Sequence, residues 1–69
     1  MKKAYELISR ILSGRERQII VMRYGIDGEE PLTQREVAAK LKISRSYVSR
    51  IEKAALEKLL LNLGGKKQF

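Results

Sequence analysis

The chain has 69 residues, and its 15 lysines and arginines outnumber 8 aspartates and glutamates, which gives a formal net charge of +7. A domain of this size buries only about 60% of its unfolded surface, so it has little room for the deep pocket of an enzyme. Because cysteine and histidine are both absent, disulfides, zinc fingers and the common nucleophilic sites are excluded, and we expect no catalytic residue, no metal site and no cofactor.

The excess of positive charge favours an anionic partner. A membrane is the weaker candidate, because no apolar run approaches the roughly 20 residues of a spanning helix and the basic residues are not confined to one amphipathic segment. Residues 1–12 are too polar for a signal peptide. We therefore expect a cytoplasmic protein that binds nucleic acid and not a membrane.

Two short helices are predicted in the first third of the chain. In residues 1–12 the apolar side chains recur at helical spacing. Ser13 is positioned to cap a second helix over residues 15–24, with Glu16 completing a capping box, and Gly25 ends that helix. The apolar positions of the first helix are Ala4, Leu7, Ile8, Ile11 and Leu12.

Residues 19–22 of the second helix are consecutively apolar, so their side chains point almost all the way round its axis. Two interpretations follow: the first helix covers the surplus, or it forms a docking groove for a partner helix. Residues 25–32 hold two glycines and the only proline and predict a surface turn, with Ile26 and Leu32 folded back onto the core. The acidic residues of this turn lack the spacing of a calcium loop.

Residues 33–59 have the pattern of a helix-turn-helix motif that continues into a longer helix. Thr33 and Glu36 form a capping box at the start of the first helix, Ala38 permits close helix packing, and Ser44 caps the second helix. The side chains predicted to face inward are Val37, Ala38, Leu41, Ile43, Val48, Ile51, Ala55 and Leu59.

The outer face of the second motif helix is basic and polar. It presents Arg45, Ser46, Ser49, Arg50 and Lys53. A helix fits the DNA major groove, where arginine donates two hydrogen bonds to guanine, and the short serines would let the helix lie deep. The alternative is a solvated basic face without function.

The second motif helix is expected to continue to residue 63, where Gly64 and Gly65 stop it, and residues 64–69 form a flexible tail. Its leucines could form a dimer interface or pack against the first helix, and we favour packing. These leucines are Leu56, Leu59, Leu60, Leu61 and Leu63. The predicted fold is thus all-α, a small four-helix domain over residues 1–63 with a C-terminal helix-turn-helix and no wing strands.

The runs LSGRER, RYGIDG, TQREVAAKL and ISRSYVSRIEKAAL together resemble region 4, the C-terminal domain, of the sigma-70 family of bacterial RNA polymerase sigma factors. The resemblance covers residues 12–59, and the last run is most similar to the sporulation sigma factors sigma-E and sigma-K. It implies a protein without enzymatic activity that recognises the −35 promoter element in double-stranded DNA and docks on the β-flap of the RNA polymerase core during transcription initiation.

The resemblance also implies roles for individual residues. Base reading falls on Arg45, Ser46, Ser49 and Arg50. DNA backbone contacts fall on Thr33, Gln34, Arg35, Lys42, Ser44, Tyr47 and Lys53. Docking on the β-flap falls on Leu7, Ile11, Leu12, Ile20, Val21 and Leu32.

Three features depart from the family pattern. Lys42 stands where many such motifs have glycine, and a left-handed backbone there would cost on the order of 1 kcal/mol, so Lys42 either adopts another turn or touches a phosphate. Nothing corresponds to region 2, and the GGKKQF tail matches no family feature. Two alternatives remain: a stand-alone helix-turn-helix regulator, or a protein-interaction domain bound by an anti-sigma protein.

Overall fold

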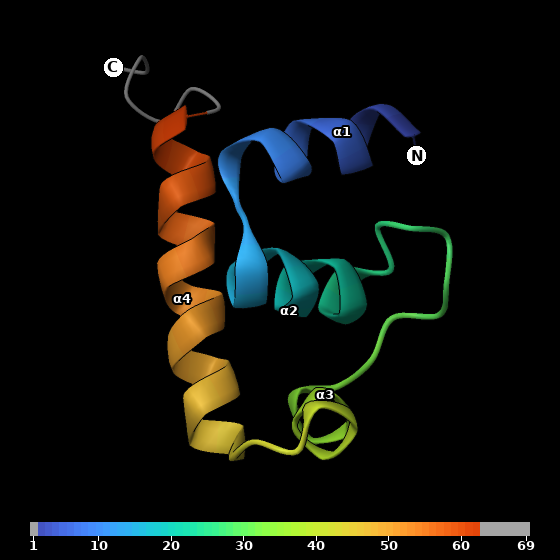
Figure 1. Ribbon diagram of the computed structural model, residues 1–69, viewed down its shortest axis with the longest axis vertical. Coiled ribbons are helices and arrows are strands. Elements are labelled where there is room, and N and C mark those ends of the chain that lie inside the picture. The colour runs from blue at the N-terminus through green and yellow to red at the C-terminus, as the bar shows by residue number, and fades with distance from the viewer. Residues whose placement is uncertain (1, 63–69) are drawn as a thin grey trace.

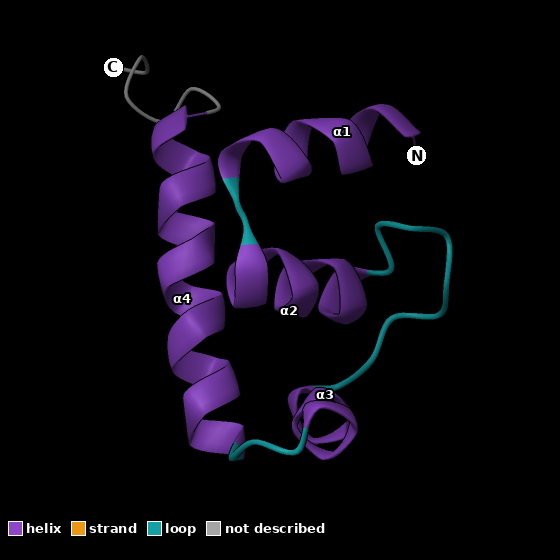
Figure 2. Ribbon diagram, in the orientation of Figure 1, coloured by secondary structure: helices purple, strands orange, loops and turns teal. Residues whose placement is uncertain are grey.

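The computed structural model describes residues 2–62, and this part of the chain folds into four helices joined by loops, without strands (Figures 1 and 2). The helices are α1 (Lys2–Ile11), α2 (Gly14–Tyr24), α3 (Gln34–Leu41) and α4 (Arg45–Asn62). The all-α prediction is confirmed.

Helix α4 is the longest and contacts each of the other three. Helices α1 and α2 lie one above the other on one side of α4, and α3 lies beside its first turns (Figure 1). The loop from Gly25 to Thr33 connects the α1–α2 pair to the α3–α4 pair. The beginning of α4 and the whole of α3 therefore form one end of the molecule, and α1 lies toward the other.

The core consists of two clusters on either side of α2. The first, here called the α1 cluster, contains Ile8, Leu12, Ile20 and Ala55. The second, the α3 cluster, contains Ile19, Val37, Ala38 and Val48. Burying each large aliphatic side chain contributes about 1.5–3 kcal/mol. Helix α4 supplies Ala55 to the α1 cluster and Val48 to the α3 cluster, so it joins the two halves of the domain.

This arrangement explains the run of four apolar residues on α2. Ile19 enters the α3 cluster and Ile20 the α1 cluster, with 0% and 1% of their surface exposed, and Val21 and Met22 are half-buried. Neighbouring helices thus cover Ile19 and Ile20, Met22 packs partly on the α3 cluster, and Val21 keeps part of its surface exposed. The prediction of an inward face is confirmed as well, since all eight of its residues are buried or half-buried.

Two of the three predicted helix caps form as expected. Glu36 N–H donates to the Thr33 hydroxyl at 3.1 Å and the Glu36 carboxylate accepts from Thr33 N–H at 2.8 Å, which is a complete capping box. The Ser44 hydroxyl accepts a hydrogen bond from Tyr47 N–H at 3.1 Å.

The capping box predicted at Ser13 is wrong. Ser13 precedes α2 with an extended backbone, but its side chain makes no capping hydrogen bond. Glu16 instead accepts hydrogen bonds from the Lys58 ammonium on α4 at 2.8 and 3.1 Å. A lysine offered by the neighbouring helix competes for the carboxylate that the local motif would have used.

Lys42 ends α3 in the left-handed conformation, with φ of 58°. Its N–H donates to the carbonyl of Ala39 at 3.4 Å, and Ile43 N–H donates to that of Ala38 at 3.0 Å. These bonds satisfy carbonyls at the helix end. The alternative turn proposed for Lys42 is therefore wrong, because the motif keeps its left-handed residue even without glycine.

The leucines near the end of α4 divide into two groups. Leu59 is half-buried against the α1 cluster, as predicted. Leu56, Leu60 and Leu61 are 37%, 63% and 61% exposed, so their predicted burial against the first helix is wrong. Successive residues turn by about 100° on a helix, and of Leu59, Leu60 and Leu61 only Leu59 faces the core. Leu63 and the tail 64–69 lie outside the described residues.

Candidate nucleic-acid interface

The first turns of α4 present the predicted base-reading residues on the surface. Arg45, Ser46, Ser49 and Arg50 are all exposed, and so is Lys53 one turn further along. Beneath them Val48 is fully buried in the α3 cluster. The buried face thus fixes the helix on the core, and the opposite face is left with donors suited to base edges.

A shallow cavity of about 540 Å³ lies where the start of α3 meets the start of α4. It is lined by Arg23, Thr33, Gln34, Arg35 and Arg45. The first N–H groups of α3 and the positive end of its dipole lie here, next to three guanidinium groups. This combination favours an anionic group such as a phosphate.

Arg23 is the member of this cavity that the sequence predictions missed. It lies in the last turn of α2, outside the helix-turn-helix motif. The loop between α2 and α3 brings Thr33 back to the cavity that Arg23 also lines. The available signal was an arginine directly before the Tyr24-Gly25 helix end, where the chain reverses.

The predicted backbone-contact residues all lie near this end of the molecule. Arg35, Lys42, Tyr47 and Lys53 are exposed. Thr33 and Ser44 are also exposed, and although both hydroxyls accept the cap hydrogen bonds, a hydroxyl can still donate to a phosphate oxygen. Gln34 differs because one of the two N–H groups of its side-chain amide already donates inside the protein, which leaves the other for a phosphate.

The partner of Gln34 is Glu52, an acidic residue on α4 that is only 5% exposed. Its Oε1 accepts hydrogen bonds from Gln34 Nε2 and Arg23 Nε, both at 2.9 Å, and its Oε2 accepts one from the Tyr24 hydroxyl at 2.7 Å. Arg23 Nη1 also donates to the Leu32 carbonyl at 2.9 Å. This Glu52 network joins α2, α3 and α4.

The network changes the acidity of two of its members. Burial alone would raise the pKa of Glu52, but hydrogen bonds from Arg23, Gln34 and Tyr24, together with the Arg23 charge, outweigh burial and hold that pKa below its ordinary value. The hydrogen bond to Glu52 raises the pKa of Tyr24, and burial and the negative charge of Glu52 add to the effect. At neutral pH Glu52 is therefore an anion and Tyr24 a neutral donor.

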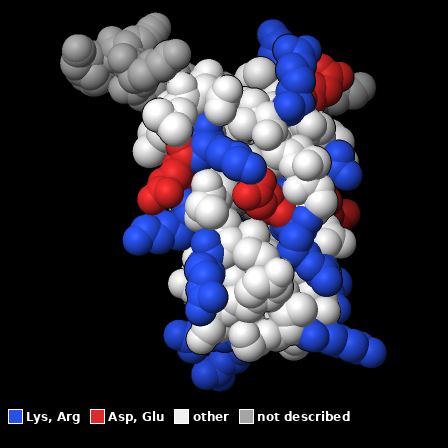
Figure 3. Space-filling model, turned by 60° about the vertical axis from the view of Figure 1, so that its left-hand side comes forward, with Lys and Arg blue, Asp and Glu red and all other residues white. Residues whose placement is uncertain are grey.

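Acidic side chains are missing from the visible face at the same end of the molecule (Figure 3). With α4 turned toward the viewer, the lower part of the surface shows lysine and arginine and no acidic side chain (Figure 3). The acidic side chains on this face lie further up, toward the middle and the α1 end. The exposed face of the first turns of α4 and the surface without visible acidic side chains therefore lie at the same end of the molecule.

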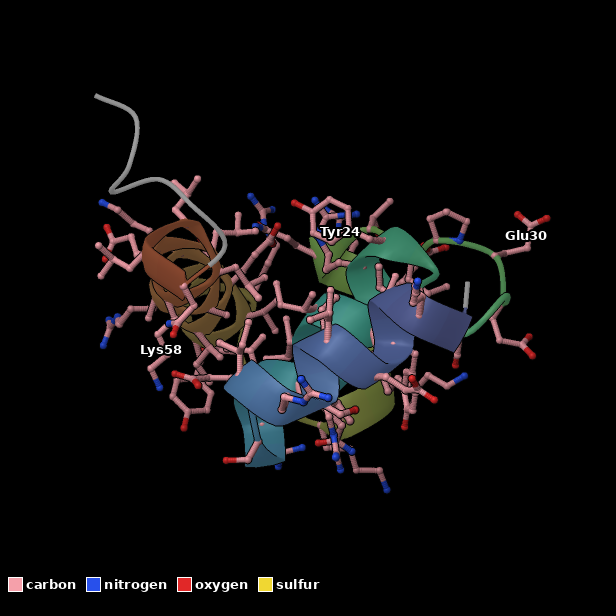
Figure 4. The ribbon with its side chains drawn as sticks, turned by 90° about the horizontal axis from the view of Figure 1, so that it is seen from above. Tyr24, Glu30 and Lys58 are labelled. Atoms are coloured by element: carbon pink, nitrogen blue, oxygen red, sulfur yellow. The ribbon has the colours of Figure 1, made fainter. Side chains whose placement is uncertain are left out.

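The acidic residues of the connecting loop lie elsewhere. Figure 4 shows Glu30 pointing outward from the loop at one edge of the molecule, with Lys58 of α4 toward the opposite edge. Asp27, Glu29 and Glu30 line a separate cavity of about 300 Å³ together with Met22, Leu32 and Lys40. Within residues 2–62 no group of three or more acidic, histidine or cysteine side chains is arranged to hold a metal ion.

The six residues implied in β-flap docking do not form one surface. Leu12 and Ile20 are each 1% exposed in the α1 cluster, so they offer no surface to a partner. Leu32 packs on the α3 cluster instead, and Val21 is half-buried. Leu7, which is 39% exposed, and the half-buried Ile11 remain, one turn apart on α1.

None of the described helices is long and apolar enough to cross a membrane.

Comparison with protein families matches residues 10–59 to the model of sigma-70, region 4. The RNA polymerase sigma-K factor of Bacillus subtilis is 59% identical over 49 residues, which are 71% of this chain and 17% of that protein. The RNA polymerase sigma-28 factor of Bacillus thuringiensis is 52% identical over 59 residues, 86% of this chain and 24% of the relative.

The RNA polymerase sigma-E factor of Clostridium acetobutylicum is 48% identical over 48 residues, 70% of this chain and 20% of that protein. The chain thus spans about a quarter or less of the length of these curated relatives. No solved structure matches it.

Proposed function

The chain belongs to the sigma-70 family through its region 4, and from this we propose that it recognises the −35 promoter element by laying α4 in the DNA major groove. The observation that supports the proposal is the cluster of Arg45, Ser46, Ser49 and Arg50 on the exposed face of the first turns of α4. Arg45 and Arg50 would donate pairs of hydrogen bonds to guanine. The shorter side chains of the two serines would contact bases that lie closer to the helix.

The cavity beside these residues supplies the second half of the interface. A DNA phosphate there would meet the N-terminus of α3 and the guanidinium groups of Arg23 and Arg35, with Arg45 at the side of the cavity that belongs to the base-reading helix. Lys42, Tyr47 and Lys53 are exposed around it and would contact neighbouring phosphates. Phosphate contacts fix the register of a protein on DNA, and base contacts then select the sequence.

Docking on the β-flap of RNA polymerase is the second part of the proposal, and its support is the exposed apolar surface at the opposite end. Leu7 and Ile11 are adjacent on α1, and Ile11 packs on the same cluster as Leu59 of α4. The exposed Leu60 follows on α4. An apolar helix that binds along α1 would leave the α3–α4 end available for DNA.

An NMR titration of the labelled chain tests both parts. Duplexes with candidate −35 elements should shift the amides of residues 44–53, and a β-flap-tip peptide should shift those of α1. A response to DNA without a response to the peptide would favour the stand-alone regulator, for which Leu60 and Leu61 could supply a dimer surface. No response to DNA even at low salt would contradict DNA recognition and leave the interaction-domain alternative.

A matched pair of variants sharpens the peptide titration. Leu7→Ser should weaken peptide binding and leave DNA binding unchanged, because Leu7 lies on α1, away from the α3–α4 end. Leu61→Ser is the control, since Leu61 is 61% exposed and points to a different side of α4 from Leu60. Equal loss with both variants would mean that the peptide binds to apolar surface without specificity.

A further inference from the structure

We propose that Glu52 is a positioning residue for DNA binding: it touches no DNA, but it holds Arg23 and Gln34 in the orientation in which they face a DNA phosphate. This inference rests on the proposed function and adds to it a residue that would otherwise count as unfavourable, because a carboxylate near a DNA interface repels phosphate.

The first step of the argument is the geometry of Arg23. Its Nε donates to Glu52 Oε1 and its Nη1 to the Leu32 carbonyl, each at 2.9 Å. Two acceptors at different edges fix both the position and the plane of a guanidinium group. The Tyr24 ring lies 5.1 Å from its central carbon and supports the same orientation. The remaining N–H groups are available to the cavity that Arg23 lines.

The second step is that Gln34 depends on the same oxygen. Its Nε2 donates to Glu52 Oε1 at 2.9 Å, and Gln34 is the first residue of α3 and also lines the cavity. One buried carboxylate therefore orders two of the five residues around the candidate phosphate site.

The third step is the position of Glu52 itself. It is 5% exposed, does not line the cavity and lies on the inner side of α4, two turns after Arg45. Through this residue the helix that would read bases is joined directly to the helix start that would hold a phosphate. The relative position of the two contact types is what sets the register on DNA.

Positioning and simple electrostatics predict opposite results for one variant. Glu52→Leu leaves no oxygen to accept from Arg23 and Gln34, whereas glutamine would keep one. It also raises the formal net charge of +7 by one, so a purely electrostatic role predicts tighter DNA binding. If Glu52 positions Arg23 and Gln34, the variant should bind DNA roughly three- to tenfold more weakly, and the slope of log K against log salt should become shallower by about 0.9, the value for one phosphate.

Tyr24→Phe is the matched control. It removes the hydrogen bond to Oε2, the second oxygen of the same carboxylate, but the ring that stacks on Arg23 remains, and Tyr24 does not line the cavity. A residue with only a structural role should change thermal stability without changing the salt slope. We expect this result for Tyr24→Phe and not for Glu52→Leu, measured by fluorescence anisotropy at a temperature where circular dichroism shows both variants folded.

A measurement on the unaltered chain gives an independent test if Glu52→Leu does not fold. The side-chain Nε–H of Arg23 should give a protected NMR signal in the free protein, and on addition of DNA this signal should persist. Its loss on DNA binding would mean that Arg23 leaves Glu52, which overturns the proposal, as would unchanged or tighter binding by folded Glu52→Leu. Failure of the wild-type chain to bind DNA would instead overturn the proposed function.

Discussion

The Tyr24 hydroxyl of α2 donates a 2.7 Å hydrogen bond to Oε2 of Glu52 on α4. The fold shifts the pKa values of these two groups in opposite directions: that of Glu52 is lowered and that of Tyr24 is raised. Folding therefore favours the ionised carboxylate together with the neutral phenol. The network stabilises the protein most between the two titrations, and the loss of stability has a separate cause on each side.

On the acid side, Glu52 should lose its contribution to stability as the pH falls. Because its pKa is lower in the folded than in the unfolded state, the unfolded chain takes up the proton first. The contribution is complete above about pH 4.5, the ordinary range of glutamate, and disappears as the pH falls through the folded-state pKa. Urea unfolding at pH 7 and pH 3 should show wild type more stable than Glu52→Gln at pH 7, with a smaller difference at pH 3.

The control for this experiment is Glu57→Gln, which removes an exposed carboxylate from the same helix. We expect its stability to stay within about 0.5 kcal/mol of wild type at both pH values. A difference between wild type and Glu52→Gln that does not change with pH would show that the Glu52 charge does not stabilise the fold.

On the alkaline side, Tyr24 should lose its contribution as the pH rises. Its pKa is higher in the folded state, so its contribution is complete below about pH 10, the ordinary value, and is lost as the pH rises through the folded-state pKa. Thermal unfolding between pH 8 and pH 11 should show wild type losing stability more steeply than Tyr24→Phe. Parallel curves would contradict the assignment.

Lys42→Gly should stabilise the fold. Lys42 has φ of 58°, which costs a lysine about 1–2 kcal/mol. Glycine removes this strain, but it also raises the conformational entropy of the unfolded chain, which offsets part of the stabilisation. The expected net increase is about 0.5–1 kcal/mol in the free energy of unfolding, measured with urea.

Gly25→Ala provides the comparison for Lys42→Gly, because the second left-handed helix end is subject to the same backbone rule. At Gly25 an added Cβ would lie 2.4 Å from the backbone oxygen of Glu29, so strain and a steric clash combine. We expect a loss of stability of more than about 1 kcal/mol. If both variants lost stability, the left-handed conformation of Lys42 would not be the source of strain that we infer.

Local patterns in the sequence predicted most of the fold. The periodicity around Val37 and Val48, the Thr33 capping box and the Gly25 helix end all depend on residues within one or two turns. Predictions failed where a distant residue competed. Glu16 bonds to Lys58, 42 positions away, and nothing near Ser13 indicates it.

The candidate site also contains residues that local patterns predict and residues that depend on distant contacts. The exposed arginines and serines of α4 follow from the helical period once Val48 and Ala55 are assigned to the core. Arg23 and Glu52 do not, because their pairing spans 29 residues and three helices. A glutamate on the inner side of an amphipathic helix signals a buried partner, but it does not identify that partner.

Lys53→Ala should weaken binding to all DNA sequences alike. Lys53 is exposed on α4 beyond the proposed base-reading residues, where an ammonium group would reach a phosphate more readily than a base. The salt slope should become shallower by about one unit. Lys3→Ala removes the same charge from α1 and should leave the slope nearly unchanged. A change in base preference with Lys53→Ala would move Lys53 to the base-reading set.

Arg50→Ala should weaken binding to the specific site by about 1–3 kcal/mol and relax the preference at one base pair, because the proposed bidentate contact with guanine would be lost. Binding to unrelated DNA should change much less. Arg10→Ala on α1 is the matched control, since Arg10 is exposed and lies on the first helix rather than at the α3–α4 end. Competition binding against a library of single-base variants measures both effects. An equal loss on every sequence with Arg50→Ala would show that Arg50 contacts phosphate, and base reading would then rest on Arg45 and the two serines.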